Sequence, residues 1–244
     1  MFGGPDDVLP LIKNPNISSR QFNAIVRNYI NVHEALDRVA PDKLKEGQSW
    51  YERANEQAER IGRIAGGDTR MGAGIIAALS PQKNWTHNLD LAEELVKTGN
   101  TRHFTGQADK ARRIMSGEDP LDVLKGPKER PFFINVNDPD DPSTATIDRH
   151  AHDQGIGREM GQKDRGLGTI GRVNIFNNAL MTASRHQGYE VPSRFQASLW
   201  VPWSEGIRPV RANNFLTDYP SPDAADAHVP TEESQEPGPG PEST

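Results

Sequence analysis

The sequence predicts an all-α protein, and two observations support this. Apolar residues recur three and four positions apart over most of residues 1–217, the spacing that places them on one face of a helix. No segment shows the alternation of apolar and polar residues that is typical of a half-buried strand. We therefore expect one helical domain over residues 1–217.

Individual helices follow from this spacing and from the residues that start and stop them. Ser18 and Ser19 are good N-caps for the first helix, and Gly66 and Gly67 end the second. The third is built from apolar and small residues, which predicts a fully buried helix. The expected helices cover residues 18–38, 42–65, 71–79, 85–97, 107–115, 129–136, 147–154, 170–187 and 193–203. Residues 137–146 and the glycine-rich residues 155–171 are expected to be loops.

The composition excludes several classes of site. The chain has 244 residues and no cysteine, which rules out disulfides, iron–sulfur clusters, thiolate zinc sites and a cysteine nucleophile. It has no apolar run of about 18 residues, so we expect no membrane span. The N-terminus lacks the basic and apolar regions of a signal peptide, which predicts a cytoplasmic protein.

The net charge of −6 is concentrated at the C-terminus. Residues 218–244 contain seven acidic residues, six prolines and no Lys or Arg, which predicts a disordered acidic tail. Residues 1–217 hold 28 basic and 27 acidic residues, a net charge of +1. A nearly neutral domain of this kind is compatible with DNA binding.

Four short segments carry the residues that could do chemistry. The expected buried helix is followed by Ser80, Pro81 and Gln82, and then by Asn84 and Trp85. A Lys-Ala-x-x-Ile segment begins at Lys110, and a turn-forming Lys-Gly-Pro-Lys segment covers residues 125–128. An Ile-Asp-Arg-His segment covers residues 147–150, where the aspartate stands at the start of a helix.

In this order, the four segments resemble the helix–hairpin–helix DNA glycosylase superfamily, over about residues 72–153. Gly126 matches the last glycine of that family's hairpin, and Lys128 matches the lysine that follows it. Asp148 matches the family's aspartate, 20 residues beyond Lys128. The same segments also resemble small uncharacterised proteins of actinobacterial phages, which would place the protein in the host cell cytoplasm.

The resemblance implies a role for each matched residue. Asp148 would stabilise the positive charge that builds on the deoxyribose as a base departs, or would activate a water molecule. Lys128 would assist, or would attack C1′ as a nucleophile. Gln82 would fill the gap left by an extruded base, and Trp85 or Trp50 would stack on that base. The alternatives are helix capping for Asp148, and phosphate contact or simple exposure for Lys128. For Gln82 the alternative is a turn residue that caps the helix at 85–97, and for Trp85 it is packing in the core or at its rim.

Further residues are expected to contact DNA or to support the pocket. The DNA contacts that we expect, besides those of Gln82 and Trp85, come from Asn84, Lys110, Arg112, Lys125, Gly126 and Arg149. His150 and His152 are expected to pack beneath Asp148. Because residues two apart on a helix face different directions, these histidines do not predict a metal site, and we expect no cofactor.

Two departures from the family pattern bear on the substrate. Pro127 removes a backbone donor from the hairpin, and the acidic residues of 138–141 would repel a DNA backbone. The leading hypothesis is a DNA glycosylase that cleaves the N-glycosidic bond of a modified base. The alternatives are a phage enzyme that hypermodifies DNA bases on the same scaffold, and a DNA-binding module without catalysis.

Overall fold

The computed structural model describes residues 17–207, without the side chains of Lys163 and Asp164. All regular structure in this part of the chain is helical, which confirms the all-α prediction. The elements, in order, are α1 Ser19–Val39, α2 Pro41–Gln48, α3 Trp50–Ile64, α4 Thr69–Leu79, α5 Trp85–Thr98, α6 Thr105–Met115, α7 Pro120–Val123, α8 Glu129–Asn137, α9 Arg149–Ile156, α10 Gln162–Arg165, α11 Ile170–His186 and α12 Pro192–Ser204. The expected acidic tail, 218–244, lies outside the described residues.

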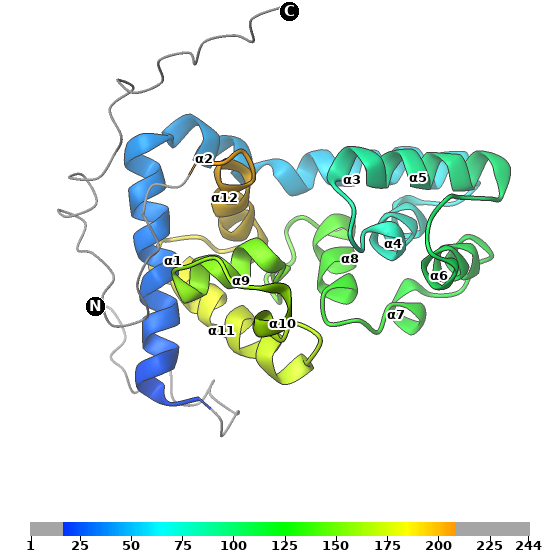
Figure 1. The fold of residues 1–244 in the computed structure, drawn as a ribbon. Helices are drawn as coiled ribbons and strands as arrows, with labels where there is room; N and C mark the ends of the chain where they lie inside the picture. Colours follow the sequence, from blue (N-terminus) through cyan, green and yellow to red (C-terminus); the bar gives the residue numbers. More distant parts are fainter. Residues whose placement is uncertain (1–16, 208–244) are drawn as a thin grey trace, which may run out of the picture.

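The helices bury their apolar residues in two hydrophobic clusters. The first cluster is formed mainly by α3 to α8, between Tyr51 and Val136. The second joins α1 and Leu44 of α2 to residues from Ala145 to Trp203. Figure 1 shows α1, α9, α11 and α12 on one side and α4 to α8 on the other, with α3 leading from one group to the other.

Close contact between α3 and α4 organises the first cluster. A Cβ atom added to Gly62 would lie 1.9 Å from the carbonyl oxygen of Asp68, and one added to Gly72 would lie 1.9 Å from that of Ala58. No side chain fits at such distances, so both glycines are needed for the helices to approach. Residues 72–79 of α4 are all buried, as the sequence predicts.

One predicted helix is wrong in its extent. The expected helix at 42–65 is divided at Ser49, whose φ of −100° and ψ of 14° lie outside the helical region, into α2 and α3. At this break Gly47 packs against the backbone of α12, where an added Cβ would lie 2.4 Å from the carbonyl oxygen of Ala197. The tertiary contact with α12 fixes the turn, and nothing in the local apolar spacing reveals it.

Two short helices lie where the sequence predicts none. Helix α7 is capped by Asp119, whose side chain accepts from the N–H of Leu121, and has Pro120 in its first turn. Helix α10 lies within the glycine-rich stretch. Neither is long enough to generate a recognisable apolar period. Within residues 17–207, no helix has both the length and the apolar character needed to cross a bilayer.

Candidate functional site

Asp148 stands at the N-cap of α9, and both of its carboxylate oxygens accept hydrogen bonds. Oδ1 accepts from the backbone N–H of Ala151 at 2.9 Å, the usual arrangement of a capping aspartate. Oδ2 accepts from the indole Nε1–H of Trp200 at 3.0 Å. The carboxylate is half-buried, so these two contacts hold it in one orientation while part of it remains accessible to solvent.

Three partly exposed tryptophans lie together beside this carboxylate. The ring of Trp50 in α3 lies 5.4 Å from that of Trp200 in α12 and 5.0 Å from that of Trp85 in α5, centroid to centroid. The buried ring of Phe132 in α8 lies 6.4 Å from Trp50. We call Trp50, Trp85, Phe132 and Trp200 the aromatic cluster. Trp50, Trp85 and Phe132 belong to or pack on the first hydrophobic cluster. Trp200 connects them to α12 and, through Asp148, to the start of α9.

Lys128 is the N-cap residue of α8 and lies one turn before Phe132, whose backbone N–H donates to the Lys128 carbonyl at 3.1 Å. Its side chain is partly exposed. The predicted catalytic pair, Asp148 and Lys128, therefore stands at the starts of two helices, α9 and α8, each of which contributes to or contacts the aromatic cluster.

The turn between α4 and α5 presents Gln82 to solvent. Its φ of 61° makes it the one non-glycine residue with a positive φ among the described residues. A left-handed conformation at a non-glycine residue costs about 1 kcal/mol, so this turn is held by its surroundings. Asn84 caps α5 by accepting from the N–H of His87 at 2.9 Å, and Trp85 is the first residue of the helix.

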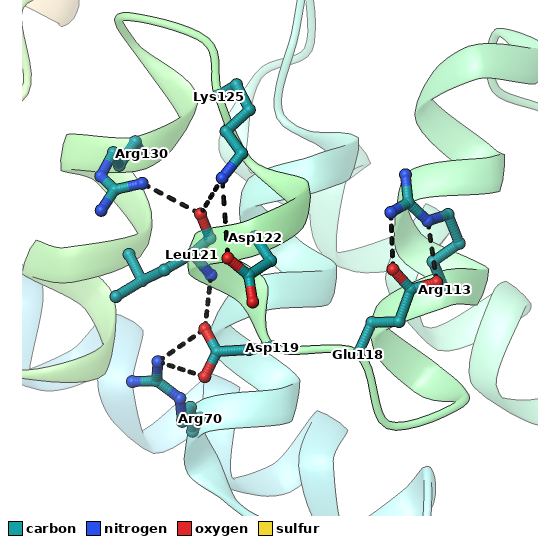
Figure 2. Close-up of polar contacts among 8 residues, drawn as sticks. All are labelled: Arg70, Arg113, Glu118, Asp119, Leu121, Asp122, Lys125 and Arg130. Carbon is teal, nitrogen blue, oxygen red and sulfur yellow. Dashed lines mark hydrogen bonds and ion pairs between the residues drawn. The ribbon is translucent and has the colours of Figure 1, made fainter.

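The turn from Leu124 to Lys128 connects α7 to α8, where the resemblance implies a phosphate-binding hairpin. Figure 2 shows that Lys125 and Arg130 both donate to the carbonyl oxygen of Leu121, each at 2.9 Å. A Cβ added to Gly126 would lie 2.9 Å from Oε2 of Glu129, so this glycine packs against the Glu129 carboxylate. The turn is thus closed by contacts within the protein.

Lys110 and Arg112 are each paired with a carboxylate of the protein. The ammonium of Lys110 lies 2.7 Å and 2.9 Å from the two carboxylate oxygens of Glu129, which is buried. Arg112 donates to Asp109 at 2.9 Å and to the carbonyl of Gly99 at 3.1 Å. These contacts give both cations a structural role and reduce the positive charge of the predicted basic patch.

The residues after Asp148 lie in different environments. Arg149 is exposed and donates from Nε to Nε2 of the half-buried His150 at 3.2 Å. His152 is fully buried, 3.0 Å from Oδ1 of Asp153 and 3.1 Å from Nη2 of Arg172. Among residues 17–207, no three His, Asp or Glu side chains are grouped as a metal site requires.

The acidic loop 138–141 is partly neutralised by α12. Nη2 of Arg194 lies 2.6 Å from Oδ1 of Asp140 and 3.0 Å from Oε1 of Glu52 at the start of α3. Asp138 and Asp141 each accept a backbone N–H within the loop, from Asp140 and Ser143. The repulsion of a DNA backbone by this loop is therefore weaker than the number of acidic residues in 138–141 indicates.

Two members of this region are not predicted from the sequence as site residues. The last expected helix, 193–203, favours a core position for Trp200, yet the structure has this side chain partly exposed and bonded to Asp148. Trp50 was considered only as a stacking surface, yet it contacts every other member of the aromatic cluster. Their shared residue type is the only signal that could have grouped them, because 150 residues separate them in the chain.

The fold and this site define an all-helical protein with an oriented carboxylate beside a partly exposed aromatic cluster. Residues 12–207 match the family described as Family of unknown function (DUF7178), and the chain belongs to this family. No curated protein matches the chain. No solved structure matches it either.

Proposed function

We propose that this protein cleaves the N-glycosidic bond of a base in DNA, with Asp148 as the catalytic carboxylate. The observation that carries the proposal is the position of Asp148, whose oriented, half-buried carboxylate lies beside the aromatic cluster. Departure of a base leaves positive charge on the deoxyribose, and a carboxylate fixed near C1′ stabilises that charge without reorganising.

The aromatic cluster would receive the base. A base must leave the DNA stack before its glycosidic bond becomes accessible, and stacking on an aromatic side chain compensates part of that loss. Trp85 and Trp200 are partly exposed and both contact Trp50. An extruded base lying against these rings would bring its sugar toward Asp148.

Two further residues, Lys128 and Gln82, have roles in the proposal. Lys128 would act on C1′ as a nucleophile or would contact a phosphate, and its place one turn before Phe132 is compatible with both roles. Gln82 would enter the space left by the base, since a turn in the left-handed conformation holds it in solvent.

The substrate that we propose is a short or locally opened DNA segment. Lys110, Arg112 and Lys125 are engaged within the protein, which leaves Lys128 and Arg149 as the phosphate contacts nearest the cluster. We also propose a relationship to the helix–hairpin–helix glycosylases. The order of α4, its turn, α6, the α7–α8 turn and Asp148 at the start of α9 supports it.

The test is release of free base from DNA by the full-length chain. Duplex and single-stranded oligonucleotides carrying uracil, oxidised, alkylated or phage-modified bases are incubated with the protein, and the free base is quantified. We expect release from at least one of them and its loss in Asp148→Asn, which keeps an oxygen for the Ala151 N–H. Asp68→Asn, at the N-cap of α4, is the matched control and should retain activity.

Binding without release, or release by Asp148→Asn, contradicts the proposal. In the first case, base modification or binding alone would be the better hypothesis. Deletion of the gene in a phage that carries it, followed by nucleoside analysis of virion DNA, separates those two.

A further inference from the structure

A buried polar cluster fastens the segment after α9 to that helix. Asp153 has 2% of its surface exposed, and its two carboxylate oxygens accept from Nε and Nη2 of Arg165 at 2.9 Å and 2.6 Å. The backbone N–H of Met160 also donates to this carboxylate. Residues 157–165 are therefore held against α9 by one buried side chain.

His152, whose surface is fully buried, links the same cluster to α11. Its Nδ1 lies 3.0 Å from Oδ1 of Asp153, and its Nε2 lies 3.1 Å from Nη2 of Arg172 in the first turn of α11. A guanidinium can only donate, so Nε2 accepts and Nδ1 carries the ring proton. The two contacts are compatible only with a neutral imidazole in this one tautomer.

We propose that His152 is a pH-sensitive latch. Addition of a proton at Nε2 removes the acceptor for Arg172 and places an imidazolium against a guanidinium. The start of α11 would then separate from α9, while the contacts of Asp153 with Arg165 and with the Met160 N–H remain. This inference is independent of the proposed function, because it rests on these contacts alone.

The charged and titratable groups around His152 favour such a response. Burial is the largest influence on the pKa of His152 and lowers it; Arg172 and Arg165 act in the same direction, and Asp153 opposes them. From α1, Tyr29 donates its hydroxyl to the carbonyl of Ala151 at 2.8 Å, and burial raises the pKa of this phenol, so it stays neutral. The contact from α12 is the carbonyl of Leu199, which accepts from Gln154 and carries no charge.

The direction of the pH dependence follows from linkage. The pKa of His152 is lower in the closed state than in the open state, where an ordinary value of about 6.5 applies. The latch is therefore fully closed above that pH and weakens as the pH falls toward the closed-state pKa. Between the two pKa values, the equilibrium constant for opening rises about tenfold per pH unit.

Hydrogen exchange of the full-length protein at pH 7.5 and pH 5.5 tests the proposal, after correction for the intrinsic pH dependence of exchange. In the wild type, amides of residues 169–176 at the start of α11 should lose protection by up to about tenfold at the lower pH, while those of α4 should not change. His152→Gln keeps an oxygen that can accept from Arg172 and cannot be protonated, so it should lose the response. His150→Gln, two residues earlier in α9, should retain it.

Equal protection of residues 169–176 at both pH values in the wild type would overturn the latch, as would a response that survives His152→Gln. If that variant does not fold, Arg172→Met provides the second test. It removes the charge that repels a protonated His152, so exchange in this segment should become the same at both pH values. A pH response that persists in Arg172→Met contradicts the proposal.

Discussion

The indole N–H of Trp200 donates to Oδ2 of Asp148 at 3.0 Å, although 52 residues separate the two in the chain. Helix α12 thereby fixes the carboxylate at the start of α9. The same α12 segment carries Arg194, which binds both the acidic loop and α3. The position of Asp148 consequently depends on how α12 packs as well as on its own helix.

Trp200→Phe should destabilise the protein by about 2 kcal/mol, because it removes a hydrogen bond to a charged group but keeps an aromatic ring. Equilibrium unfolding in urea measures the effect. Trp85→Phe is the control in the same cluster and should cost less, since the ring contact with Trp50 is preserved. Equal stability of Trp200→Phe and the wild type would mean that the bond to Asp148 contributes nothing.

Gly62→Ala should cost about 3 kcal/mol or more, because its new methyl group would overlap the carbonyl of Asp68 and force α3 and α4 apart. Gly106→Ala provides a control of opposite sign. This glycine lies in α6 with no atom within 4 Å of an added Cβ, so alanine should stabilise the helix by up to about 1 kcal/mol. Thermal unfolding of both variants tests the prediction, and a mild effect of Gly62→Ala would contradict the close helix contact.

Arg70→Gln should raise the pKa of Asp119 toward its ordinary value. The hydrogen bonds from Arg70 and from the Leu121 N–H hold that pKa low (Figure 2). A lowered carboxyl pKa adds stability above the ordinary pKa of about 4, and this is lost as the pH falls. Carboxyl NMR titration measures the shift. Arg113→Gln is the control, since it should instead raise the pKa of Glu118 and leave Asp119 unchanged.

On the proposed function, removal of residues 218–244 should raise the affinity for DNA, because the seven acidic side chains of this segment would compete with phosphates for the same cations. The affinity of both forms should fall with salt, and the difference between them should shrink as salt screens the charges. Fluorescence anisotropy with a labelled oligonucleotide at two salt concentrations measures this. Equal affinities at low salt would refute the competition.

The sequence predicts the helices well because their evidence is local. The apolar run of α4 and the capping residue Ser18 specify structure within one or two turns, and the structure has both where expected. The prediction of one helix over 42–65 fails for the opposite reason, because the break at Ser49 depends on a contact between Gly47 and α12. Long-range packing of this kind leaves no periodic signature.

The candidate site was predictable only in part. Asp148 at a helix start and Trp85 near the turn after α4 follow from spacing and capping rules. The partners of the positively charged residues do not follow from such rules. The sequence presents Lys110 as a surface charge, whereas its partner Glu129 lies 19 residues away and is buried. Nor does any pattern join Trp50 to Trp200, because side chains meet there through the packing of two separate helices.

The two hydrophobic clusters differ in how far apart their residues lie in the sequence, and we expect this difference to set the order in which the clusters fold. Apart from Ala197, the first uses one continuous stretch, from Tyr51 to Val136, whose contacts require only short loops to close. The second must bring residues 22–44 to residues 145–203, across all of that stretch. Of the described helices, α1 and α2 leave the ribosome before the others, and we expect them to find their partners last. Their apolar faces would then wait until the residues up to Trp203 have been synthesised.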